Sequence, residues 1–150
     1  MIIAVDFDGT IVEHDYPRIG KPIPFAIEVL RRLQETGRHT FLLWTVREGD
    51  LLQEALDYCS KNGVEFYAAN KNYPEEEDGE SPRKLMADVF IDDKNIGGLP
   101  DWVNIYNAIM SDSLYFEDID DYTSEANRPK KKKNFLSRLG DALDTAQKYR

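Results

Sequence analysis

Four short apolar runs, separated by stretches with helical periodicity, constrain the fold of this chain more than any other feature. We expect strands at residues 2–6, 40–45, 64–69 and 87–91, because each run is apolar throughout rather than alternating. Such strands are buried on both faces, which is typical of parallel sheets covered by helices. The sequence therefore predicts an α/β fold, a Rossmann-like three-layer sandwich with a mainly parallel sheet.

Two helices are expected between these runs. Residues 23–36 follow helix-start signals around Pro24 and place Leu30 and Leu33 on one face. Residues 49–62 carry apolar residues at i, i+3, i+4 and i+7, the last of them Cys59. Parallel sheets of this kind bind ligands at the carboxyl ends of their strands, so functional residues are expected there.

Polar residues follow three of the expected strands. Asp6 and Asp8 come after the first strand in "DFDGT", Thr45 ends the second, and Asp92 and Asp93 follow "ADVFI". Residues i and i+2 of an extended strand point the same way, so the two aspartates of the first strand are expected to lie together. Four carboxylates at one sheet edge would repel one another unless a cation lay between them. Mg²⁺ binds carboxylate oxygens and substrate phosphate, so the sequence predicts a magnesium and phosphate site.

The order of these residues resembles the haloacid-dehalogenase-like (HAD) phosphohydrolases. The pattern of that family is Asp-x-Asp-x-Thr, an apolar strand ending in Thr or Ser, a Lys, and an apolar strand ending in paired acids. The matching elements here are "DFDGT" at 6–10, "FLLWT" ending at Thr45, Lys84, and the pair Asp92 and Asp93. The resemblance implies a Mg²⁺-dependent phosphatase that hydrolyses a phosphate monoester through an aspartyl-phosphate intermediate.

The resemblance also implies a role for each acidic residue. Asp6 would be the nucleophile that attacks phosphorus, and Asp8 the general acid and base. Mg²⁺ would be held by the Asp6 carboxylate, the Asp8 backbone carbonyl and Asp92. Asp93 would bind the metal through water or support its other ligands.

Phosphate-binding residues are implied in the same way. Thr45 would hold the phosphoryl oxygens by a hydrogen bond and Lys84 by its charge, with Lys71 as the substitute for Lys84. Gly9 suits a tight turn beside the site. Arg47 is close enough to Thr45 along the chain to touch substrate, although arginines at helix starts are often only solvated.

Five other residues are expected to have structural roles or none. We expect Trp44 to face the core and Cys59 to pack as a small hydrophobe, and Asn95 either to orient the acidic loop or to be a simple turn residue. His14 and His39 are not expected to be catalysts. His14 belongs to a loop, and His39 precedes a strand far from its carboxyl end.

The spacing of the motifs leaves no room for a cap domain. Between Asp6 and Thr45, and again between Thr45 and Lys84, there are 38 residues, which one helix with its connections fills. In the HAD family the caps are inserted in these two intervals, so the resemblance implies a capless HAD-like catalytic domain at residues 1–110, with residues 12–24 as the short flap that members carry. Its open site favours phosphate carried on a large molecule, or else a partner subunit or the tail serves as the lid.

Charge separates the end of the chain from the rest. Residues from Arg128 on hold eight of the 19 basic and two of the 28 acidic residues, which leaves residues 1–127 with 11 and 26 and a net charge of −15. Residues 111–129 are polar and acidic and are expected to be a linker, and residues 130–150 to form a basic amphipathic helix. The leading interpretation is that this helix packs against its own domain or a second copy of the chain. Attraction of its lysines to nucleic acid or a membrane surface is the alternative.

Composition narrows the other partners and the compartment. The net charge of −9 argues against nucleic acid as the main partner, because an acidic surface repels phosphate chains. No apolar stretch approaches the roughly 18 residues of a membrane span, and the single cysteine excludes an internal disulfide. A soluble cytoplasmic protein is expected.

Two other classes of function fit parts of the pattern. Receiver-type signalling domains also place acids, Thr and Lys around Mg²⁺. Their paired acids lie on the first strand and their phosphate-accepting Asp on a later strand, which is the reverse of the order here. A noncatalytic phosphate-binding or scaffolding module on the HAD fold would also explain the motifs. The intact catalytic positions favour the enzyme.

Overall fold

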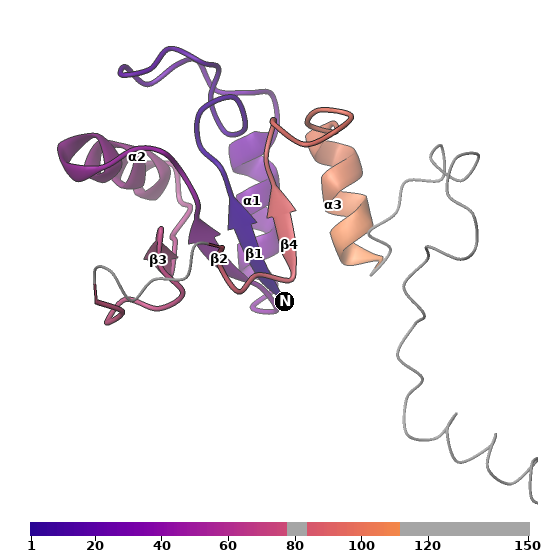
Figure 1. The fold of residues 1–150 in the computed structure, drawn as a ribbon. Coiled ribbons are helices and arrows are strands. Elements are labelled where there is room, and N and C mark those ends of the chain that lie inside the picture. Colours follow the sequence, from indigo (N-terminus) through magenta and orange to yellow (C-terminus); the bar gives the residue numbers. More distant parts are fainter. Residues whose placement is uncertain (78–83, 112–150) are drawn as a thin grey trace, which may run out of the picture. The chain divides into compact units, whose positions relative to one another are not determined.

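The structure of the protein, a computed structural model, describes residues 1–77 and 84–111 of the chain. They form a four-stranded, all-parallel sheet in the order β3-β2-β1-β4, together with three helices (Figure 1). The elements in chain order are β1 (Ile2–Val5), α1 (Ala26–Glu35), β2 (Thr40–Leu43), α2 (Gly49–Lys61), β3 (Ala68–Ala69), β4 (Val89–Ile91) and α3 (Trp102–Met110). The predicted α/β class and parallel sheet are therefore confirmed.

The predicted linker and basic helix are not tested by this structure. Residues 112–129 and 130–150 lie outside the described residues. None of the described helices is long and apolar enough to cross a bilayer.

Parallel pairing brings three strand ends to one level. β1 lies between β2 and β4, with Val5 opposite both Leu43 and Ile91. The ladder continues one residue further, because Asp6 N donates to Ile91 O at 2.9 Å and Trp44 N donates to Val5 O at 2.8 Å. The residues that follow these strands therefore meet at one edge of the sheet.

One face of the sheet packs against all three described helices. Side chains of β1 and β2, such as Val5 and Leu43, share a buried cluster with Leu33 of α1, Cys59 of α2 and Ile105 of α3. Figure 1 shows α1 behind the sheet. Cys59 is fully buried there, and burial raises the pKa of its thiol to about 12, so its expected role as a small hydrophobe is confirmed.

The opposite face is covered by irregular chain. Ala4 of β1 and Leu42 of β2 pack there against Ala68 and Leu85. The chain runs from β3 at one edge of the sheet to β4 at the other edge, the opposite direction to the steps from β1 to β2 and from β2 to β3. Because crossovers between parallel strands are right-handed, this connection lies on the face opposite α1 and α2. The helical layer expected on this face is not found among residues 1–77 and 84–111.

Every expected strand and helix is shorter in the structure, and two of them differ most. The helix expected from residue 23 begins at Ala26, because Phe25 before it has φ +66° and lies outside the helical region. The strand expected at 64–69 is limited to Ala68–Ala69 at the sheet edge, where β2 is its partner. All of these differences concern element ends, where local backbone geometry overrides the apolar pattern.

Helix α3 was not anticipated, although its signal is present in the sequence. The Asp101 side chain accepts from the backbone N–H groups of Val103 and Asn104, which is a helix N-cap. Trp102 and Ile105 follow at helical spacing and are buried. An N-cap residue before apolar residues at i and i+3 was sufficient to predict this helix.

The first testable prediction concerns the buried indole of α3. Trp102 Nε1 donates to Thr10 O at 3.1 Å, and only 2% of this side chain is exposed. Trp102→Phe keeps most of the ring volume but leaves the carbonyl without its donor, so the free energy of unfolding should fall by about 1–3 kcal/mol in urea titrations. Trp44→Phe, at a partly buried indole, is the control and should cost less. Equal stability of parent and Trp102→Phe would contradict this role.

Candidate functional site

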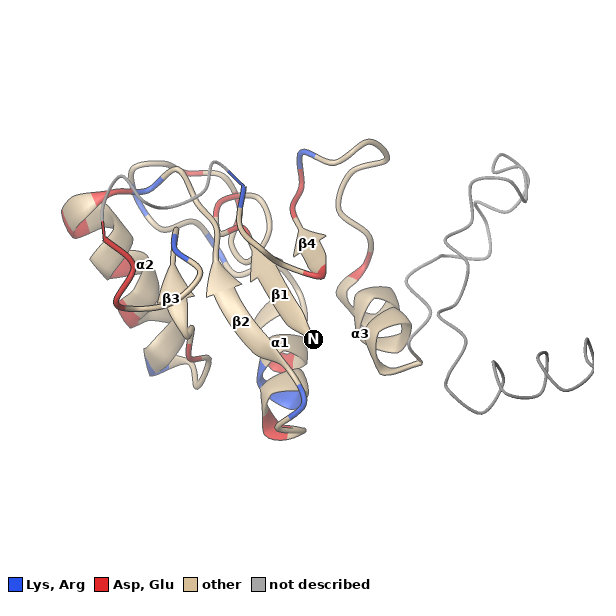
Figure 2. Cartoon of the chain, turned by 60° about the horizontal axis from the view of Figure 1, so that its bottom comes forward, with Lys and Arg blue, Asp and Glu red and all other residues tan. Residues whose placement is uncertain are grey.

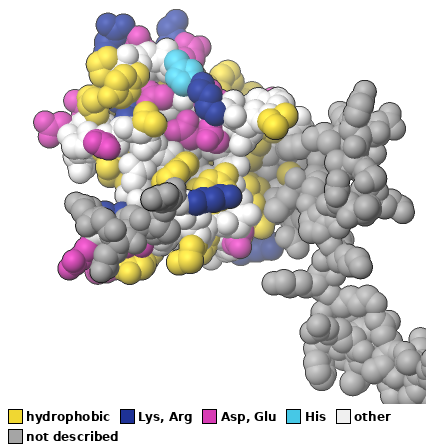
Figure 3. Space-filling view, viewed as in Figure 1, with side chains coloured by type: hydrophobic (Ala, Val, Ile, Leu, Met, Phe, Trp, Pro, Cys, Tyr) yellow, Lys and Arg dark blue, Asp and Glu magenta, His cyan; other side chains and the backbone are white. Residues whose placement is uncertain are grey.

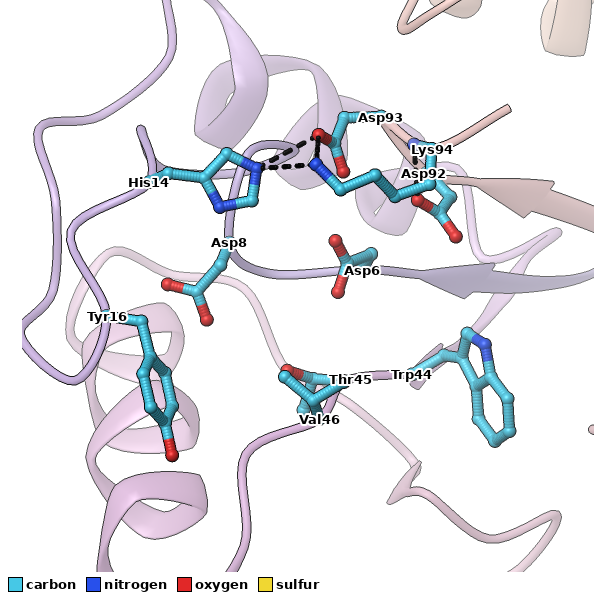
Figure 4. A pocket seen from close by; sticks show the side chains of 10 residues that line it. All are labelled: Asp6, Asp8, His14, Tyr16, Trp44, Thr45, Val46, Asp92, Asp93 and Lys94. Atoms are coloured by element: carbon cyan, nitrogen blue, oxygen red, sulfur yellow. Dashed lines mark hydrogen bonds and ion pairs between the residues drawn. The ribbon is translucent and has the colours of Figure 1, made fainter. Parts of the chain in front are cut away.

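A cavity of about 400 Å³ opens at the carboxyl ends of the strands. Its lining comes from the residues that follow β1, β2 and β4 and from the loop after β1 (Figure 4). The lining residues are Asp6, Asp8, His14, Tyr16, Trp44, Thr45, Val46, Asp92, Asp93 and Lys94. In Figure 2 the chain turns red directly after β4 and then blue, and in Figure 3 acidic side chains gather beside a histidine. The edge predicted to carry the site therefore carries a cavity with acidic walls.

Three carboxylates form a cluster in this cavity. Asp6, Asp92 and Asp93 each offer an oxygen, and these oxygens all lie within 4.8 Å of one another. Burial raises the pKa of Asp6 to about 6, and repulsion from the other two carboxylates adds to the shift. Asp93 Oδ1 is buried without a hydrogen-bond partner. Crowded carboxylates with an unsatisfied oxygen fit a hard divalent cation, so these residues fit the expected Mg²⁺.

Asp8 does not join this cluster, which corrects the sequence analysis. Both of its carboxylate oxygens accept hydrogen bonds from Arg47, Nε to Oδ2 and Nη2 to Oδ1, each at 2.7 Å. Strand β1 ends at Val5, so the same-side rule for residues i and i+2 no longer applies at Asp8. Three carboxylates crowd together instead of four, and an arginine compensates the fourth.

The interpretation of Arg47 as a solvated residue is wrong, and the structure gives its side chain other partners than the cavity. Its side chain is 0% exposed, so it is not solvated, and it is not among the residues that line the cavity. Its guanidinium lies 5.0 Å from the centre of the Phe7 ring, and its hydrogen bonds to Asp8 raise its pKa further above the ordinary arginine value. Nothing local in the sequence distinguishes this arginine from one at an exposed helix start.

The flap expected at residues 12–24 lies beside the cavity. Its base is closed by backbone hydrogen bonds from Glu13 N to Lys21 O at 2.7 Å and from Ile23 N to Ile11 O at 2.9 Å. Tyr16 and His14, in its first half, line the cavity. The flap therefore contributes side chains to the site.

Thr10 and Gly9 of "DFDGT" join the parts of the site. The buried Thr10 hydroxyl donates to Asp6 Oδ2 at 3.4 Å and accepts from Asp93 N at 3.1 Å. Gly9 has φ +91°, and a Cβ added there would overlap His14 Nε2 and the Asp93 carboxylate. Gly9 is therefore required by space as well as by backbone conformation.

The cavity contains a different lysine from the one predicted. Lys84 does not line it, and its ammonium lies 4.9 Å from the centre of the Phe90 ring. Lys71, the expected substitute, is not a lining residue either. Lys94 lines the cavity and donates to Asp93 Oδ2 at 2.7 Å, which raises the pKa of this lysine. It directly follows the paired acids, and that position was the signal available in the sequence.

Sequence reasoning also underestimated a histidine and a tryptophan. His14 Nε2 lies 3.0 Å from Asp93 Oδ2 and 3.0 Å from Lys94 Nζ, so this loop residue belongs to the site (Figure 4). Trp44 packs against the buried cluster around Leu42, as expected, but it also lines the cavity. Trp44 directly follows β2 and His14 lies in the loop after β1, and cavity residues are common at such places.

Two asparagines support loops at the site. Asn70 Oδ1 accepts from Thr45 N at 2.9 Å, and Asn70 Nδ2 donates to Arg47 O at 3.4 Å. Asn95 O accepts from Gly98 N at 2.8 Å, as in the predicted turn, and Asn95 Nδ2 donates to the backbone carbonyl of Asp92 at 2.9 Å, so the side chain also orients the acidic loop. The phosphate-binding candidate Thr45 is thus held from the end of β3, a contact that no local pattern predicts.

The raised pKa of Asp6 predicts how stability depends on pH without metal. The folded state binds this proton more tightly than the unfolded state, whose pKa is near 3.8, so Asp6 costs stability as pH rises from about 4 to about 6. Asp6→Asn cannot ionise. In EDTA, the free energy of unfolding of Asp6→Asn should therefore exceed that of the parent only slightly at pH 4, and the difference should reach its full size above pH 6. Urea unfolding measures both values.

The control for this experiment is Asp50→Asn, at an exposed position of α2. It should show no such trend, and added Mg²⁺ should reduce the gain of Asp6→Asn by stabilising the parent. A gain that is constant from pH 4 to pH 7 would contradict the electrostatic origin.

Comparison with known proteins gives a relationship to one solved structure. No protein-family model matches the chain, and no curated protein matches it. The chain is similar to the structure of a conserved protein coded by a locus of Bacteroides thetaiotaomicron, with 56% sequence identity and a TM-score of 0.71. The match covers 83% of this chain and 98% of that chain. The chain therefore belongs to the same family as this conserved Bacteroides thetaiotaomicron protein.

Proposed function

We propose that the protein is a Mg²⁺-dependent phosphatase of the HAD type, which hydrolyses a phosphate monoester through an aspartyl-phosphate. The observation that carries the proposal is the cluster of Asp6, Asp92 and Asp93 at the carboxyl end of a parallel sheet. The same cavity holds Thr45 and Lys94, which can bind phosphoryl oxygens. The proposal agrees with the residue order that resembles the HAD family.

The first chemical step forms the covalent intermediate. An oxygen of the Asp6 carboxylate attacks phosphorus, and the bond between phosphorus and the ester oxygen breaks. The departing alkoxide takes a proton from Asp8, so a neutral alcohol leaves. Asp8 lines the cavity and uses one lone pair of each oxygen for Arg47, which leaves the others for this proton transfer.

The second step regenerates the carboxylate. Asp8, now ionised, takes a proton from a water molecule as the water oxygen attacks phosphorus. The bond between phosphorus and the Asp6 oxygen breaks, inorganic phosphate leaves, and Asp8 carries the proton for the next cycle. One residue therefore serves as acid and then as base.

Other residues of the cavity bind and orient the phosphoryl group. Thr45 Oγ1 accepts from Arg47 N at 3.3 Å, so its O–H can donate to a phosphoryl oxygen. The Lys94 ammonium supplies charge-assisted hydrogen bonds. Asp6, Asp92 and Asp93 would hold Mg²⁺, which when bound supplies the positive charge that lets an anionic phosphoryl group approach three carboxylates.

The same proposal includes the absence of a cap domain. The interval between Asp6 and Thr45 is occupied by the flap, α1 and β2. The described part of the interval between Thr45 and Lys84 consists of α2, β3 and their connections. A site without a cap suits phosphate on a large molecule, as the spacing of the motifs suggests.

The proposal is tested by turnover of p-nitrophenyl phosphate with and without Mg²⁺. The parent should release p-nitrophenolate only when Mg²⁺ is present. Asp6→Asn should fall below a tenth of the parent rate, because an amide is a poor nucleophile, while Asp50→Asn should keep the parent rate. If Asp6→Asn stays above a tenth of the parent rate, Asp6 is not the nucleophile. No turnover by the parent at any metal concentration would favour the noncatalytic phosphate-binding module.

A matched pair of lysine variants tests the phosphate-binding role. Lys94→Ala should lower kcat/KM about tenfold to a hundredfold, the equivalent of the roughly 1.5–3 kcal/mol of a hydrogen bond to a charged group. Lys84→Ala, which removes an exposed lysine outside the cavity lining, should leave kcat/KM within about twofold of the parent. The opposite ranking would return the role to Lys84.

A further inference from the structure

The proposed chemistry gives no task to a buried charged group that lies beside the cavity. Arg47 follows β2 and does not line the cavity, yet its side chain is completely buried. A buried guanidinium is costly unless all of its surroundings compensate it. The partners of Arg47 therefore indicate why this position carries an arginine.

The guanidinium of Arg47 connects two parts of the site. It donates two hydrogen bonds to Asp8, from Nε and Nη2, each at 2.7 Å. It donates two more to the flap backbone, from Nη1 to Pro17 O at 2.9 Å and from Nη2 to Arg18 O at 2.8 Å. Four of its five N–H groups are accounted for by these contacts.

Aromatic rings fix the plane of the same group. The Phe7 and Tyr16 rings lie with their centres 5.0 Å and 5.4 Å from Arg47 Cζ, one from the motif loop and one from the flap. A lysine has a point charge and no planar fork, so it could not bind both Asp8 oxygens and both flap carbonyls at once. The site thus requires the geometry of arginine and not only its charge.

We propose that Arg47 is a positioning residue that couples the flap to the proton-transfer group: Asp8 is held in its working orientation only while the flap is seated on the same guanidinium. This inference rests on the proposed function, since it gives Asp8 the acid and base role. Lifting the flap removes two acceptors from Arg47 and frees the guanidinium to rotate, so Asp8 loses its orientation. Conversely, loss of Asp8 removes two bonds that hold the guanidinium against the flap.

The coupling is tested without any activity by trypsin cleavage after Arg18. This side chain is exposed, while its carbonyl is held by Arg47. In the full-length protein, Arg47→Lys should raise the rate of cleavage after Arg18 at least about fivefold. Asp8→Asn should raise it as well, although this residue does not touch the scissile bond. Arg38→Lys, at an exposed arginine far from the flap along the chain, is the matched control and should leave the rate unchanged.

Global unfolding is separated from flap release by cleavage after Lys61 at the end of α2. Cleavage there should stay at the parent level in every variant. If Asp8→Asn leaves cleavage after Arg18 unchanged, or if both sites become more sensitive to the same extent, the coupling is refuted and Arg47 has only a structural role.

The second readout is a comparison of two substrates. Departure of an alkyl alcohol needs a proton from Asp8, whereas departure of p-nitrophenolate, an activated leaving group, does not. Arg47→Lys should lower kcat for an alkyl phosphate at least about tenfold, with KM changed less than about threefold. The burst of p-nitrophenolate, which reports the first step with a leaving group that needs no acid, should keep its parent rate. An equal loss for both substrates would overturn the role in proton transfer. Failure of the parent to turn over any ester would overturn the phosphatase proposal, while the trypsin result would still decide the coupling.

Discussion

In-register parallel pairing of β1 with β2 and β4 is the constraint on which the rest of the structure depends. Backbone hydrogen bonds place Val5, Leu43 and Ile91 at the same height, so the three strands end together. The next residue of β1 and the next of β4 are both aspartates, and the pairing forces them into proximity. The cavity and the carboxylate cluster are therefore products of sheet register and not of the loops alone.

The protein compensates its acidic residues in two different ways. The carboxylate of Asp8 is paired with a buried arginine of fixed geometry. In the clustered carboxylates of Asp6, Asp92 and Asp93, the main partners among the described residues are Lys94 and His14, and both of them contact Asp93. A permanent partner fixes a side chain in place, whereas like charges favour whichever cation is offered. This division separates a positioned group from a group that can bind a ligand.

The sequence predicted the parts of the fold that depend on local patterns. Continuous apolar runs located β1, β2 and β4, and the strand-end rule located Asp6, Thr45 and the paired acids. Contacts between distant segments were not predictable: Arg47 meets Asp8 across 39 residues, and Thr45 is supported by Asn70. Lys94 and α3 are a different case, because their signals are local: a lysine directly after the paired acids, and an N-cap residue before apolar residues at helical spacing.

The pairing of β4 with β1 also has a consequence for the order of folding. Strand β4 pairs with β1 from far along the chain, and Ile2 N, at the start of β1, bonds the Asp88 side chain across 86 residues. Closing so long a loop is entropically slow compared with forming α1 or pairing β1 with β2. Asp92 and Asp93 reach Asp6 only through that closure. The three carboxylates, which could hold a metal ion, are thus brought together only when β4 has been added to the sheet.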